Sequence, residues 1–143
     1  MTEIKIGGRV LPLSYTAYEM IAIQREIGCT AFELKDVVLG IHLADEDDPS
    51  SVRLEIINDP ERVEKLGKLI AILANAGLEE KGETADITAK WVLRNMKPVM
   101  ILTYAVEVMA EISEGNMMEK KPEENGPVDE GLEEIQAKKQ PGN

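Results

Sequence analysis

Residues 99–112 are apolar around almost the whole circumference of a helix, and this segment restricts the fold more than any other. Its apolar side chains are Val99, Ile101, Leu102, Tyr104, Ala105, Val106, Val108, Met109 and Ile112. Because a helix without a polar face must be covered on several sides, it belongs at the centre of a bundle or against another chain. Glu107 and Glu111 interrupt the segment, which is shorter than the roughly 20 residues needed to span a bilayer. The sequence therefore predicts a central, buried helix.

Pairs of capping residues predict where the other helices begin. A hydroxyl or carboxylate before a helix accepts hydrogen bonds from its first N–H groups, and Pro is favoured at the first helical position. The pairs and their expected helices are Thr16 with Glu19 for about 17–27, Thr30 with Glu33 for about 31–42, Asp59 with Pro60 for about 60–77, and Asp86 or Thr88 for a helix through Met96. We expect Gly28 and Gly77 to end two of these helices, and Pro98 to kink the chain or start the next helix.

Alternation of apolar and polar residues predicts a small β-hairpin at the N-terminus. The stretches 3–6 and 9–13 flank a Gly-Gly pair, which suits a two-residue turn with positive φ. We expect Ile4, Ile6 and Val10 to share the inward face of this hairpin.

The composition changes at Asn116, beyond which Lys, Glu, Pro and Gly follow one another and apolar residues are few. Such a segment cannot bury enough apolar surface to offset the entropy of ordering. We therefore predict a mainly α domain over 1–115, with an N-terminal hairpin and four to five helices, and a disordered polar tail over 116–143. Within the domain, residues 52–57 form either a third strand that joins the hairpin or a helical turn.

The residues that could carry chemistry are few, and each has an ordinary structural explanation. The acidic run 45–48 lacks the Gly and Glu of a calcium-binding EF-hand loop, because Ser50 and Ile56 occupy those positions, so we expect a solvated loop. His42 has no nucleophile that can be named beside it, and Cys29 is expected to pack as a small apolar residue. The sequence predicts no catalytic residue, no metal and no cofactor, and therefore no enzyme.

The charge distribution favours a protein partner. Sixteen Lys and Arg against 27 Asp and Glu give a net charge of -11, which argues against binding nucleic acid or an anionic membrane. Methionines near the end of the domain, and an apolar pair within 129–139, are adaptable contacts. The candidate partner-binding residues are Met109, Ile112, Met117, Met118, Leu132 and Ile135. The apolar segment 99–112 also predicts self-association. The N-terminus has no signal-peptide pattern, so a reducing, intracellular compartment is expected.

The order of elements and several sequence strings resemble the tail assembly chaperones of long-tailed bacteriophages and related prophages. The strings are IKIGGRVLPLSYTAYEMIAIQREIG (4–28), AFELKDVVLGI (31–41), LIAILANAGLEEKGETADITAKWVLRNMKP (69–98) and AEISEG (110–115). A polar tail follows them. The resemblance covers about residues 3–115 and includes no motif specific to partner binding.

This resemblance implies a protein that binds the tape measure protein, a long helical and apolar chain, and recruits tail tube subunits around it. Such chaperones act in the cytoplasm of the host bacterium and are absent from the mature virion. Members are often made in a short form and, by ribosomal frameshifting, in a longer form, and this chain resembles the short form. The alternative is another tail component, such as a completion or connector protein, that remains in the particle.

Overall fold

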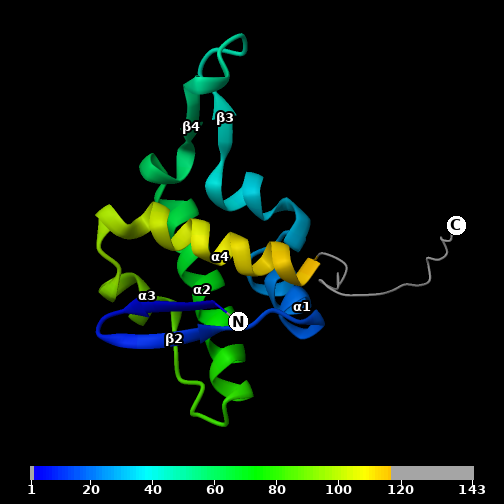
Figure 1. Cartoon of the computed structure of the whole chain (residues 1–143), viewed down its shortest axis with the longest axis vertical. Helices are drawn as coiled ribbons and strands as arrows, with labels where there is room; N and C mark the ends of the chain where they lie inside the picture. The colour runs from blue at the N-terminus through cyan, green and yellow to red at the C-terminus, as the bar shows by residue number, and fades with distance from the viewer. Residues whose placement is uncertain (1, 117–143) are drawn as a thin grey trace, which may run out of the picture.

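The computed structural model describes residues 2–116, which form a mainly α domain with an N-terminal hairpin, as the sequence predicts (Figure 1). Its α-helices are α1 (Ala17–Glu26), α2 (Pro60–Glu80), α3 (Ala89–Asn95) and α4 (Ile101–Asn116). Two antiparallel hairpins pair β1 (Thr2–Ile6) with β2 (Arg9–Leu13), and β3 (Ile41–Leu43) with β4 (Val52–Leu54). Short 3-10 or π segments connect them: η1 (Ala31–Glu33), η2 (Lys35–Leu39), η3 (Pro49–Ser51), η4 (Glu55–Asn58) and η5 (Pro98–Met100). Of the predicted tail, 117–143 lie outside the described residues.

The predicted starts of α1, α2 and α3 are confirmed. The Thr16 hydroxyl accepts from the N–H of Tyr18 at 3.3 Å, while the Glu19 carboxylate accepts from the N–H of Thr16 at 2.9 Å. Asp59 caps α2 and Thr88 caps α3 through hydrogen bonds of the same kind, each at 3.0 Å. In each of these hydrogen bonds the donor and the acceptor are two or three residues apart, so the local sequence is enough to predict them.

The central helix is α2, and the prediction that residues 99–112 occupy the centre is wrong. Fully buried side chains follow α2 along its length: Leu66, Leu69, Ile70 and Leu73. In Figure 1 α4 crosses α2, and α2 also contacts β2, α1, α3, η2 and η4. Before its last three residues, which are all exposed, the exposed residues of α4 fall at i, i+3, i+7 and i+10 and form one stripe: Thr103, Val106, Ala110 and Ser113. Because small or β-branched residues make up this stripe, α4 can leave one side uncovered, and self-association remains a prediction.

Gly77 does not end α2, which continues to Glu80, and the prediction of a stop there is wrong. The glycine instead lets strand β2 approach the helix closely. A Cβ at this position would lie 2.5 Å from the carbonyl carbon of Pro12 and closer still to its oxygen. Next to this contact, the N–H of Ser14 donates to the carbonyl oxygen of Leu73 at 3.1 Å. The absence of a side chain therefore allows the hairpin to pack directly on the central helix.

The register of the first hairpin turns Val10 outward, against the prediction. Its two-residue turn pairs Ile6 with Arg9, so Val10 pairs with Lys5 and Leu11 with Ile4. Paired residues share a face of the sheet, so Val10 lies on the face of Lys5 and is 56% exposed. Leu11 takes the inward position and is fully buried.

The sequence predicts one helix over 31–42, and this prediction is wrong: the segment forms a series of short elements. Glu33 accepts from the N–H of Thr30 at 2.9 Å, as expected, and η1 and η2 follow. Gly40 then has a φ of +64° and ends η2, so the next residues are free to form β3. Strand β4 pairs with β3 and not with the N-terminal hairpin, and η4 follows it directly. Both alternatives for 52–57, strand and helical turn, therefore occur in succession.

Candidate partner-binding groove

Two adjoining hollows lie where η4, η5, α3 and the first turns of α2 and α4 meet. The first, of about 510 Å³, is lined by Ile57, Asn58, Asp59, Pro60, Val63, Leu93, Met96, Pro98 and Ile101. The second, of about 570 Å³, is lined by Ala44, Val52, Arg53, Leu54, Glu55, Ile57, Asn58 and Leu102. The two hollows share the lining residues Ile57 and Asn58 and are together called here the apolar groove.

Ile57 stands between the two hollows as the main exposed apolar side chain of the groove. It is 58% exposed, while the preceding Ile56 is fully buried in the core. The 3-10 turn of η4 separates them, since successive side chains in such a turn point about 120° apart. Val52, at 53% exposure, adds a second exposed apolar side chain to the second hollow, and Val99, at 85%, is next in sequence to the groove residue Pro98. Exposed apolar area gathered at a depression is typical of a site that binds another protein.

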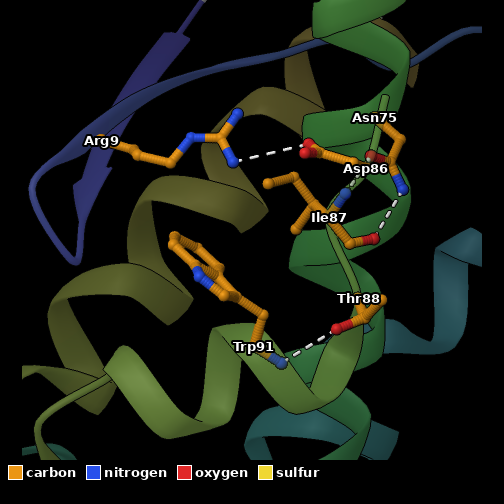
Figure 2. A network of polar contacts seen from close by, with 6 residues as sticks. All are labelled: Arg9, Asn75, Asp86, Ile87, Thr88 and Trp91. Atoms are coloured by element: carbon orange, nitrogen blue, oxygen red, sulfur yellow. Dashed lines mark hydrogen bonds and ion pairs between the residues drawn. The ribbon is translucent and has the colours of Figure 1, made fainter. Parts of the chain in front are cut away.

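The wall of the groove that α3 provides is held by a polar network (Figure 2). The side-chain amide of Asn75 on α2 donates to the carbonyl oxygen of Ile87 and accepts from its N–H, both at 2.9 Å. Arg9 of β2 lies 3.4 Å from Asp86, and its guanidinium carbon lies 5.6 Å from the centre of the Trp91 ring. Contacts from both β2 and α2 thus fix the segment that leads into α3.

Close packing of α3 on α2 places the apolar wall residue Leu93. A Cβ at Gly67 on α2 would lie 2.8 Å from Cγ of Leu93, so this glycine leaves the space that the leucine occupies. Leu93 is partly buried and Met96 is buried, and both line the first hollow. The groove is therefore built on a rigid support.

The opposite wall is fixed through Arg62 in the first turn of α2. Its Nε lies 3.1 Å from Oδ2 of Asp59, and its Nη1 donates to the carbonyl oxygen of Val37 at 2.9 Å. This arginine ties η2 to the start of α2, next to the groove residues Asp59 and Pro60. Arg62 is thus engaged beside the groove, whose first hollow is lined mainly by apolar residues and whose second hollow is also lined by Arg53 and Glu55.

Of the residues predicted to bind a partner, the structure describes two, and it buries both. Met109 is 7% exposed and Ile112 is 3% exposed. They line a separate hollow of about 340 Å³ beside Phe32, which is 75% exposed. Their part in any contact is therefore to support that hollow. Met117, Met118, Leu132 and Ile135 lie outside the described residues.

Sequence analysis missed the groove residues Ile57 and Val52. The one local signal was the adjacent pair Ile56 and Ile57. Successive side chains of a strand or a surface helix point in different directions, so only one of the two can face the core. Which of the two faces the core depends on the packing of η4 against η2 as well as α2, and η2 belongs to a distant part of the sequence.

The structure shows the surroundings of two of the candidate chemical groups, Cys29 and Asp48. Burial raises the pKa of the Cys29 thiol, and the charge of Glu33 raises it further, while Lys65 acts in the opposite direction. Hydrogen bonds from the side chain and N–H of Ser50 lower the pKa of Asp48 in the exposed loop 45–48. His42 lies in β3, opposite Arg53 in the register, and not at a helix end.

Within residues 2–116, no three His, Cys, Asp or Glu side chains gather in a way that could hold a metal ion. Over the same part of the chain, no helix has the length and apolar character needed to traverse a bilayer. Comparison with protein families, with curated proteins and with solved structures finds no match for this chain. The apolar groove is consequently the feature on which a functional argument can be based.

Proposed function

We propose that this chain is a phage tail assembly chaperone whose apolar groove binds a helical segment of the tape measure protein. The observation that carries the proposal is the exposed Ile57, which lines both a mainly apolar hollow and a second hollow of mixed character. A helix that lies in such a groove inserts side chains spaced at i, i+3 or i+4 and i+7 on either side of a ridge. The resemblance over residues 3–115 supports the same assignment.

The energetics suit reversible binding. Fully burying an isoleucine contributes about 1.5–3 kcal/mol, so covering the exposed 58% of Ile57 contributes about 1–2 kcal/mol. A few contacts of this size keep an apolar client soluble and still allow it to be displaced when tail tube subunits arrive. The net charge of -11 would keep the complex in solution. Action in the host cytoplasm and absence from the virion are part of this proposal.

The test is co-expression with a tape measure protein encoded in the same genome. The wild-type chain should increase the soluble amount of that protein and elute with it. Ile57→Lys should lower complex recovery at least about tenfold, equivalent to about 1.4 kcal/mol of lost binding. Because apolar burial dominates, the complex should survive about 0.5 M salt, at which charge interactions are screened within roughly 4 Å.

The matched control is Ile21→Lys, which makes the same change at a residue of α1 that is 47% exposed and lies outside the groove. It should leave recovery within about twofold of wild type. Equal losses for Ile21→Lys and Ile57→Lys would exclude the groove as the binding site. If the tape measure protein is no more soluble with the chain than without it, and mass spectrometry finds the chain in purified particles, the alternative of a tail component that remains in the virion replaces the chaperone.

A further inference from the structure

A second surface, beside the groove, is rimmed by positive charges. Its hollow of about 600 Å³ lies between α2 and α3 and is lined by Glu64, Lys68, Ala89, Lys90, Leu93 and Arg94. These residues are called here the cationic patch. Three cations against one acid stand out on a chain whose net charge is -11. The patch meets the apolar groove only at Leu93.

The cations of this patch are available to a partner. Lys68, Lys90 and Arg94 are exposed, and none of them forms an ion pair with another residue in the range 2–116. The apolar side chains of Ala89 and Leu93 line the same hollow. An apolar floor with a basic rim fits an amphipathic segment that carries acidic residues.

The chain itself contains such a segment at residues 128–137. Three apolar residues stand at i, i+4 and i+7, the spacing of one helix face: Val128, Leu132 and Ile135. The same ten residues include four acids and no base: Asp129, Glu130, Glu133 and Glu134. The segment is too short to be a stable helix alone, so it needs a surface on which to fold.

The connection is long enough for this segment to reach the patch. The twelve steps from Asn116 to Val128 span at most about 40 Å. The chain passes from α3 through η5 directly into α4, so α4 separates its last residue, Asn116, from α3. That helix has 16 residues and is about 24 Å long.

We propose that residues 128–137 bind the cationic patch of the same chain, with Leu132 and Ile135 against Leu93 and the acidic side chains beside Lys68, Lys90 and Arg94. This contact does not depend on the function proposed for the groove. Since charges contribute to it, it weakens with salt, whereas client binding in the groove does not.

Carbodiimide cross-linking of the full-length chain tests the contact, because this reagent joins a carboxylate to an amine that touches it. Mass spectrometry should find links from Lys68 or Lys90 to Glu133 or Glu134 in the monomer. Arg94→Glu and Leu132→Asp should each lower their yield at least about fivefold, and about 0.5 M salt should lower it about threefold. Lys5→Glu, an equal charge change on the exposed face of β1, should leave the yield within about twofold.

Two results would overturn the proposal. One is a set of links spread equally over Lys5, Lys35 and the patch lysines, which would mean that the tail has no fixed site. The other comes from mixing ¹⁵N-labelled and unlabelled chains: links that join one chain to another would assign the segment to a second copy. Thermal melting of each variant would confirm that it is folded, so that neither result can arise from unfolding.

Discussion

Replacement of Gly77 by Ala tests whether the hairpin packs directly on the central helix. The new methyl group would lie 2.5 Å from the Pro12 carbonyl carbon, a separation that real Cβ atoms essentially never show. Because the obstacle is backbone, no side-chain rotation can relieve the clash and β2 must move away. Overpacking of this kind costs about 1–3 kcal/mol, and loss of the hydrogen bond from Ser14 to Leu73 costs about 1 kcal/mol more. The helix propensity of Ala returns about 1 kcal/mol, so the net destabilisation should be about 1–3 kcal/mol.

Urea unfolding followed by circular dichroism measures this change. Gly67→Ala is the matched control, because it lies in the same helix and its Cβ would meet Cγ of Leu93 at 2.8 Å, a side chain that can rotate. The gain in helix propensity then offsets most of the strain, and stability should change by less than about 1 kcal/mol. A Gly77→Ala protein as stable as wild type would refute the close contact, since propensity alone would then decide the outcome.

The other predictions concern α4 and the single thiol. Val108→Asp places an unpaired carboxylate at a fully buried site and should cost about 3 kcal/mol or more in urea unfolding, whereas a loss below about 1 kcal/mol would remove Val108 from the core. Cys29, with its raised pKa and 7% exposure, should react with a thiol reagent at pH 8 at least about tenfold more slowly in the native chain than in urea. Burial chiefly, and the charge of Glu107, raise the pKa of Tyr104, so folding favours the neutral phenol. The stability from this group is then complete below about pH 10 and is lost as pH rises through the folded-state value, and Tyr104→Phe should flatten this alkaline decline.

The helix starts could be predicted from sequence because each depends on residues within one turn. Thr16, Asp59 and Thr88 accept hydrogen bonds from N–H groups two or three positions ahead, whatever the rest of the chain does. The Gly28 that follows α1 acts locally in the same way, with a φ of +92°. Local rules of this kind also predict the mainly α fold class.

Gly77 shows why other features could not be predicted. A glycine that follows an apolar run has the pattern of a helix end, yet its role here is set by Pro12, which lies 65 positions earlier in the sequence. The second hairpin could not be predicted for the same reason. The pairing of Ile41 with Leu54 competes with helix formation, and these two residues are 13 positions apart. No residue pattern within either segment reports these distant partners.

Several of the most exposed apolar side chains lie in the short 3-10 segments. Phe32, Ile57 and Val99 lie in η1, η4 and η5 and are 75%, 58% and 85% exposed. A 3-10 turn of three or four residues cannot continue an apolar stripe, so when it contains adjacent apolar residues, one of them faces water. The longer α4 buries most of its apolar residues against α2 and β1 and leaves mainly small ones outside. Apolar surface open to a partner therefore collects at the junctions between helices. The groove accordingly lies beside η4 and η5, and the segment 99–112 contributes to it only at its start, through Ile101 and Leu102.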